Sequence, residues 1–567
     1  MGSSLFRKKS IDKIIADQHE IEALEGENMV RNLGVRDLTF LGVAAIIGAS
    51  IFSAIGQASA NGGPAVSLLF VFTAVACMFT AFCYARFAAT VPISGSAYTY
   101  AYTSLGEFIA WILGWNLLLE YAISNVAVAI SWSKYFVDLL EGLQIHVPEF
   151  LTMDLLSAKR AYLEATNLLA NGSRLEDLSV NLREGYIAYA ESPVILGFHF
   201  VANIPALLIT VAITYLVYIG IKESKNMNNV LVVLKLLVIG IVVGVGAFYV
   251  KVENWSPFAP NGVAGVLKSV AAVCFAYIGF DSISTTAEEC KNPQRDIPKA
   301  MMWALIICTG LYVLVTLVLT GIVPSGSLTG IEDPLAYMFT LVGLHGVAGV
   351  VAASAVIALT SALLVYQLGQ PRIWMTMSRD GLLPKAFSRI HPKYRTPSFS
   401  TIMTGVLVGL PALFANLEEV INLSSIGTLF AFVLVCGGVL ILDLDPSNQG
   451  KSKFRIPYFN AQYVVGLSFL LAVYLFWPDS LAEWSKSHVS GEAKADTWIM
   501  SMFFLSWLAL AVASYWKKLS LIPVLGLLIN LYLMTQMGSA NWERFMYWCL
   551  VGVAIYFAYG YRKSKLV

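Results

Sequence analysis

Apolar segments separated by short polar connections occupy most of this chain. Fourteen of these segments are long enough to cross a bilayer, at approximately 36–60, 64–91, 106–140, 197–221, 227–250, 262–288, 299–323, 343–376, 398–416, 420–443, 459–477, 497–516, 519–536 and 541–561. About 20 apolar residues suffice for one helix to span the hydrocarbon core. The pattern therefore predicts an all-α polytopic membrane protein with about 14 transmembrane helices.

A break in the first span is the most informative local feature. Gly48, Ala49 and Ser50 interrupt the apolar run Ile46–Phe52 with small residues. A helix interrupted inside a membrane leaves amides and carbonyls unpaired, which is tolerated only beside protein or a polar cavity. The freed amides suit a carboxylate and the freed carbonyls suit an ammonium, so together they suit an amino acid. For this stretch alone, small-residue packing on an unbroken helix remains an alternative.

A similar break recurs five spans later. Ala276–Ser282 places Gly279 and the ionisable Asp281 inside the sixth apolar span. Transporters built from inverted repeats carry such breaks at equivalent positions of the two repeats. The pair of breaks therefore predicts two five-helix inverted repeats, residues 36–250 and 262–443, with discontinuous first and sixth helices.

The polar segments complete the domain organisation. We expect a cytoplasmic amphipathic N-terminal segment, an extracytoplasmic insertion made of short helices, a cytoplasmic linker and four C-terminal helices, at residues 1–35, 141–196, 444–458 and 459–561. With the termini inside, 26 Lys and Arg fall in cytoplasmic segments, 10 fall outside and one lies within a span. The positive-inside rule then places both termini in the cytoplasm, and the plasma (cell) membrane is the default location.

Composition excludes several other classes of protein. The 567 residues are 57% apolar and 13% charged, and the net charge of +1 argues against nucleic-acid binding. The seven cysteines include no CxxC pair, and the six histidines include no HExxH pair. We therefore expect no metal, no other cofactor and no enzymatic activity.

Several motifs resemble one transporter family. They are Ile47–Phe52, Gly95–Tyr98, Gly114–Leu117, Phe275–Asp281 with Glu288 and Glu289, Asn292–Pro298, Pro371–Ile373, Ser378–Pro384 and the run from Pro523 to Gly560. Together they resemble the amino acid–polyamine–organocation (APC) superfamily, and within it the cationic amino acid transporter family, over nearly the whole chain. The resemblance implies the LeuT-like fold, with a substrate site between the first, third, sixth, eighth and tenth spans.

The resemblance also implies roles for the residues at the breaks. The substrate carboxylate would meet the amides of Ala49 and Ser50. The substrate ammonium would meet backbone carbonyls on both breaks, namely those of Ile46, Phe275, Ala276 and Ile278, and Phe275 would also belong to an aromatic gate. Two residues depart from the family pattern: Ser50 stands where glycine is common, and Arg86 stands where relatives carry an acid. We expect Arg86 to extend to the membrane interface.

Lys235 is the one basic residue deep within a span. Inserting a central lysine costs about 2.5–3.5 kcal/mol, so it needs a partner or must lose its proton. It resembles a fifth-span lysine that takes the place of sodium in this superfamily, which would bring its ammonium to carbonyls around Ala45 to Gly48. Transport would then be independent of sodium, with proton coupling if Lys235 titrates. A permanently charged tether is the equal alternative.

Two acids also fall inside spans. Glu120 could balance Lys235, attract a cationic substrate side chain, or be a structural acid bonded to neighbouring helices. Asp281 could cap the half-helix after the break or take part in gating.

These features predict a secondary transporter of L-amino acids. The chain has no GxxxxGK[ST] loop, so an ion gradient, exchange or the membrane potential must supply the energy. Arginine and lysine are the expected substrates, with small neutral amino acids such as alanine in addition. The alternatives are an exchanger of neutral amino acids and a non-transporting sensor. The expected partners are the amino acid, the lipid bilayer and, as an open question, a small accessory membrane subunit.

Overall fold

The computed structural model describes most of the chain. The described residues are 5, 7–9, 33–91, 96–171, 174–195, 197–219, 224–287, 290–331, 333–394, 396–444, 454–474 and 495–565. The amphipathic segment expected at 10–32, the acidic pair Glu288 and Glu289, and most of the linker at 444–458 lie outside them.

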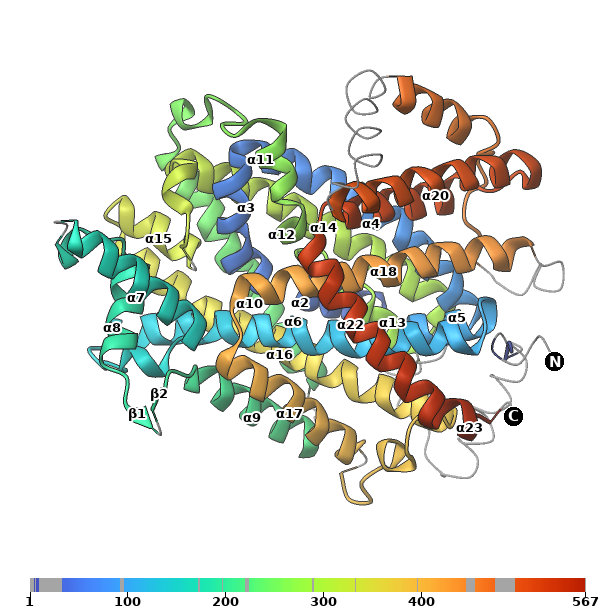
Figure 1. Ribbon diagram of the computed structural model, residues 1–567, viewed down its shortest axis with the longest axis horizontal. Coiled ribbons are helices and arrows are strands. Elements are labelled where there is room, and N and C mark those ends of the chain that lie inside the picture. The colour runs from blue at the N-terminus through green and yellow to red at the C-terminus, as the bar shows by residue number, and fades with distance from the viewer. Residues whose placement is uncertain are drawn as a thin grey trace.

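Long helices lie alongside one another and form the body of the molecule (Figure 1). The first half contains α2 (Val35–Ile46), η1 (Ser50–Ala54), α3 (Ile55–Gly62), η2 (Gly63–Ala65), α4 (Val66–Thr90), α5 (Ser96–Ser104), α6 (Glu107–Gly142), α9 (Ile204–Ile219), α10 (Ser224–Gly246) and η5 (Ala247–Tyr249). The second half contains η6 (Val252–Trp255), α11 (Gly262–Lys268), α12 (Val270–Phe275), α13 (Ser282–Thr285), α14 (Pro293–Ile322), η8 (Ser325–Leu328), α15 (Pro334–Leu341), α16 (His345–Arg379), η9 (Lys385–Ser388), α17 (Ser398–Phe414) and α18 (Leu417–Leu444). The C-terminal part contains a helix at Val464–Tyr474, then α20 (Ala495–Lys517), α21 (Leu521–Thr535), α22 (Ser539–Ile555), η11 (Tyr556–Gly560) and α23 (Tyr561–Lys563).

The helices have the length and composition of membrane spans. Among the described residues, seven helices are long and apolar enough to cross a bilayer. The number rises to eight if Leu521–Thr535 and Ser539–Lys563, which meet at a bend of 111°, together form one span. Large apolar side chains such as Leu208, Leu237 and Leu467 are more than 60% exposed on the surface of the bundle. An exterior of this kind suits lipid rather than water, so the expectation of a polytopic membrane protein is confirmed.

Three long helices of the first half each lie along a helix of the second half. α6 lies along α16, α4 lies along α14, and α9 lies along α17. Small residues such as Ala355 and Ala358 on α16 let the helices approach closely, as is typical of membrane interfaces. Ser124 on α6 and Ser424 on α18 join their hydroxyls at 2.7 Å. The breaks in the first and sixth spans lie within this core.

The insertion at 141–196 folds over one end of the bundle. It contains η3 (Glu149–Leu151), α7 (Leu155–Ala170), η4 (Leu175–Asp177) and α8 (Val180–Ala190), as short helices were expected. Asp154 caps α7 by accepting from the amide of Ser157 at 2.8 Å. An antiparallel strand pair, β1 (Val194–Ile195) and β2 (Phe198–His199), follows and was not anticipated. The insertion lies at the opposite end from α5 and α23 (Figure 1).

Candidate functional site

The first break follows the end of α2. The helix stops at Ile46, and Ile47 leaves the helical region with φ −83° and ψ 86°. The amide of Gly48 then turns back to the carbonyl of Ile46 at 3.1 Å, and the chain resumes as the π-helix η1 at Ser50. A Cβ on Gly48 would lie 3.1 Å from the Cβ of Ala362 on α16, which favours glycine at this position.

The second break separates α12 from α13. α12 ends at Phe275 and α13 begins at Ser282, with Gly279 between them at φ +109°. This left-handed conformation suits glycine, and a Cβ there would lie 2.8 Å from the Cβ of Ala45 on α2. Both helices are thus interrupted where the sequence predicts, and the two breaks pack directly against each other.

Two buried tyrosines connect the breaks, and sequence reasoning missed both. The hydroxyl of Tyr312 on α14 lies 2.9 Å from the carbonyl oxygen of Ile46 and 2.8 Å from that of Ala276. The hydroxyl of Tyr366 on α16 lies 3.2 Å from the carbonyl oxygens of Ala45 and Ile278. Each hydroxyl carries one hydrogen, so it donates to one of its two carbonyls at a time.

All four carbonyls expected to meet an ammonium have protein donors. Ile46 and Ala276 share the hydroxyl of Tyr312, and Ile278 receives that of Tyr366. The carbonyl of Phe275 accepts from the amide of Ile278 at 3.2 Å. The break therefore leaves none of these acceptors without a donor, as burial in a membrane protein requires.

Ser50 uses its hydroxyl inside the first break. Its Oγ donates to the carbonyl of Ile46 at 2.8 Å and lies 2.7 Å from the hydroxyl of Tyr312. Serine at this position, where glycine is common in the family, thus adds a hydroxyl that links Ser50, after the break, to Ile46, before it. Ala49, which precedes it, is 1% exposed.

Lys235 on α10 reaches the carbonyl side of the first break. Its Nζ donates to the carbonyl of Ile47 at 2.8 Å and to that of Ala44 at 3.3 Å, and the residue is 1% exposed. These acceptors overlap the range expected from the sequence and begin one residue earlier. Within the described part of the chain Lys235 makes no ion pair with Glu120.

Glu120 and Asp281 form a pair of buried acids near the second break. They are 2% and 1% exposed, and their charges are close enough to interact. The hydroxyl of Tyr121 donates to Asp281 Oδ2 at 3.4 Å. Glu120 Oε2 and Asp281 Oδ1 have no hydrogen-bond partner among the described residues. The Asp281 side chain does not cap α13, so the structure does not show the capping alternative.

The site contains hydrogen-bonding groups and charges but no constellation of metal ligands. Among the residues that the structure describes, no group of three His, Cys, Asp or Glu side chains could hold a metal ion. Peptide groups, one lysine and two carboxylates can bind and orient a charged small molecule.

Comparison with known proteins identifies the family. The model of the amino acid permease family matches residues 33–555. The chain is 36% identical over 567 residues to the branched-chain amino acid permease BcaP of Bacillus subtilis, covering 100% of both chains. It is 39% identical to the methylthioribose transporter of the same organism, covering 80% of this chain and 89% of the relative. It is also 32% identical to the chloroplastic cationic amino acid transporter 9 of Arabidopsis thaliana, covering 98% and 92%.

These matches extend across both breaks and both halves of the bundle, and the relatives are transporters. The chain therefore belongs to the amino acid permease family, with the cationic amino acid transporters of the APC superfamily, and is an amino acid transporter rather than an enzyme.

Proposed function

We propose that this protein is a sodium-independent secondary carrier of cationic L-amino acids, arginine and lysine, that also accepts small neutral ones such as alanine. The observation that carries the proposal is the pair of facing breaks, with a buried ammonium on one and two incompletely bonded carboxylates near the other. The carrier changes which side of the membrane the site faces, as inverted-repeat transporters do.

The backbone at the breaks would bind the α-carboxylate and α-ammonium that all amino acids share. The amides of Ala49 and Ser50 are the proposed carboxylate donors. The substrate ammonium would donate hydrogen bonds to the carbonyls of Ile46 and Ala276 in place of the Tyr312 hydroxyl. An ammonium has three donors where the hydroxyl has one, so it can satisfy both carbonyls at once.

Lys235 supports independence from sodium. Its ammonium already lies on the carbonyls of Ala44 and Ile47, which are the kind of ligand that a sodium ion would need. A sodium ion at the same place would be repelled by the lysine, so the protein supplies this positive charge itself. Release of a proton from Lys235 would couple transport to protons.

The two buried acids support a cationic substrate. A guanidinium or ammonium side chain would donate hydrogen bonds to Glu120 and Asp281, each of which has one oxygen with no donor among the described residues. A membrane potential then favours uptake by about 2.3 kcal/mol per 100 mV for each positive charge. For a neutral substrate, protons on these acids would serve instead.

A neutral branched-chain amino acid is the second candidate substrate. BcaP, named for that substrate class, matches over the full length of both chains. Exchange of neutral amino acids, or sensing without transport, would also use backbone recognition at the breaks. The two acids separate the candidates, because a neutral substrate does not need their charge.

We also propose the finer architecture predicted from the sequence: 14 crossings, inverted repeats at 36–250 and 262–443, and both termini in the cytoplasm of a plasma-membrane protein. The packing of α6 on α16, α4 on α14 and α9 on α17 supports the repeats. The position of the insertion, opposite α5 and α23, supports the topology (Figure 1).

Uptake into proteoliposomes tests the proposal. Radiolabelled arginine, alanine and leucine are offered separately, with sodium or choline outside and at several pH values. We expect arginine uptake that is unchanged by choline and increased by an inside-negative potential. Glu120→Gln should reduce arginine uptake more than leucine uptake, whereas Glu418→Gln, on the exposed end of α18, should change neither. Leucine uptake without arginine uptake would support the neutral candidate, and sodium-dependent uptake would contradict the role given to Lys235.

A further inference from the structure

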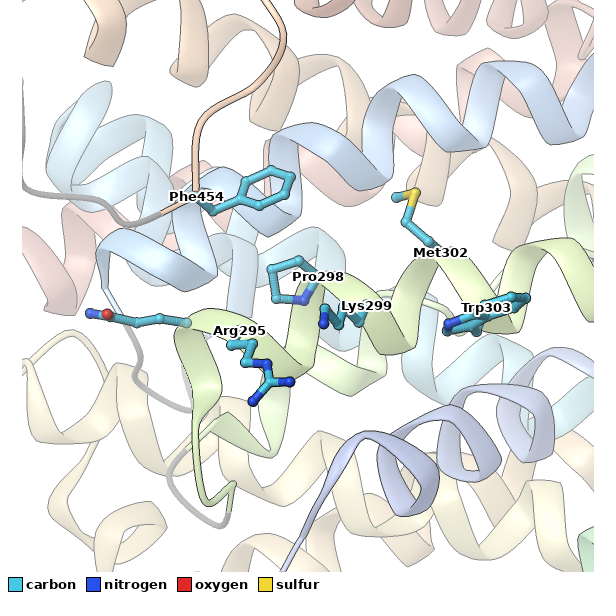
Figure 2. Close-up of a pocket in the computed structure, with 7 residues that line it drawn as sticks. Arg295, Pro298, Lys299, Met302, Trp303 and Phe454 are labelled. Atoms are coloured by element: carbon cyan, nitrogen blue, oxygen red, sulfur yellow. The ribbon is translucent and has the colours of Figure 1, made fainter.

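A hollow of about 370 Å³ lies at the start of α14, away from the helix breaks. Its lining combines two cations and an amide with apolar side chains: Gln294, Arg295, Pro298, Lys299, Met302, Trp303 and Phe454. Six of these residues belong to α14, and Phe454, from the segment after α18, lies across from Pro298 (Figure 2).

The charge of the lining is entirely positive. Arg295, Lys299 and Trp303 are spaced four residues apart, so they share one face of α14, and all three are exposed. Within the described residues neither Arg295 nor Lys299 forms an ion pair. The nearest acid on this helix, Asp296, is buried on another face at 6% exposure. The hollow is therefore suited to an anion.

The same face of α14 changes from basic to apolar side chains along the helix. Beyond the two cations it continues with Trp303, Ile306 and Leu314, which are 55%, 49% and 48% exposed. Exposed apolar side chains on a membrane-spanning helix face lipid, and tryptophan prefers the interface. Arg295 and Lys299 precede this stripe by one to two turns, where a head-group phosphate would lie.

The Phe454 wall of the hollow is held in place by Arg86. The guanidinium donates to the carbonyl of Phe454 at 3.3 Å and pairs with Asp443 at 3.1 Å. The Phe454 ring also stacks on Phe82 of α4, with ring centres 6.4 Å apart. Arg86 thus does more than extend to the interface, and the hollow has a fixed wall.

We propose that this hollow binds an anionic phospholipid, with the phosphate between Arg295 and Lys299 and an acyl chain along Trp303 and Met302. A soluble anion would use the two cations but would gain nothing from the apolar stripe. A zwitterionic lipid would use the stripe, but its own cationic group would oppose the two positive side chains. An anionic lipid uses both parts of the lining, and basic hollows at helix ends are known to suit such head groups.

Native mass spectrometry of the purified full-length chain in detergent tests this site directly. Phosphatidylglycerol is titrated against the protein, with phosphatidylcholine and inorganic phosphate in parallel titrations. We expect phosphatidylglycerol to bind at least tenfold more tightly than phosphatidylcholine. Inorganic phosphate at the same concentration should not displace it.

The double variant Arg295→Gln, Lys299→Gln should weaken phosphatidylglycerol binding at least fivefold, because both side chains are exposed and their loss need not disturb folding. Its matched control is Lys517→Gln, Lys518→Gln, which removes two exposed charges from the end of α20, beside the exposed Trp516. The control should change binding less than twofold. An equal fall in both variants, no fall in either, equal binding of the two lipids, or displacement by inorganic phosphate would each overturn the proposal.

Discussion

Replacing Lys235 with methionine tests the role of the buried ammonium. The substitution keeps an unbranched apolar side chain, shorter by the terminal nitrogen, but removes the donors to the carbonyls of Ala44 and Ile47. Each hydrogen bond from a charged group contributes about 1.5–3 kcal/mol, so the two bonds together contribute about 3–6 kcal/mol. Relief from burying the charge returns about 2.5–3.5 kcal/mol. This relief offsets much of the lost bonding, so Lys235→Met should fold.

Lys235→Met should nevertheless disturb the geometry of the first break. Loss of the stronger bond, 2.8 Å to Ile47, removes about 1.5–3 kcal/mol of support for the break. Since about 1.4 kcal/mol corresponds to a factor of ten, uptake should fall at least tenfold.

The assay is amino acid uptake into proteoliposomes at several external pH values. Lys268→Met makes the same substitution at an exposed position on α11 and should leave uptake unchanged. If Lys235 carries the coupling proton, Lys235→Met should also flatten the pH profile, and if it is a permanent tether the profile should keep its shape at a lower rate. A folded Lys235→Met protein with the rate and pH profile of the original would refute the reasoning for both roles.

Three further substitutions probe the breaks and the first turn of α6. Tyr312→Phe removes the hydroxyl that competes with the substrate for the carbonyls of Ile46 and Ala276. Amino acid binding measured in detergent should therefore tighten by up to about tenfold, while uptake slows. Weaker binding would instead make the hydroxyl a substrate ligand. Gly279→Ala should abolish uptake, because the φ of Gly279 is +109° and overpacking against Ala45 costs about 1–3 kcal/mol. The control Gly310→Ala, where a Cβ would meet open space, should transport normally. Glu107→Gln should lower the thermal unfolding temperature, because three hydroxyls donate to this buried carboxylate. Each hydrogen bond to a charged group contributes about 1.5–3 kcal/mol, so an unchanged unfolding temperature would contradict a stabilising role for Glu107.

Local sequence was enough to predict the membrane class and the two helix breaks, and to single out Lys235 as a buried cation. A bilayer gives backbone groups no water to bond, so apolar runs become helices, and a glycine with polar neighbours inside such a run marks an interruption. Gly48 and Gly279 could therefore be found without a structure. A lone buried cation such as Lys235 is conspicuous for the same reason, because hydrocarbon makes it costly.

Partners distant in sequence were decided only by the tertiary structure. Tyr312 lies 266 positions from Ile46, and Tyr366 lies 88 positions from Ile278, yet their hydroxyls bond to carbonyls that were expected to meet an ammonium. A tyrosine within an apolar span is compatible with simple packing, so nothing local distinguishes these two. The pairing of Arg86 with Asp443 is equally non-local. Hydrophobic patterning is a local property of the sequence, whereas the partner of a polar side chain depends on which helices pack together in three dimensions.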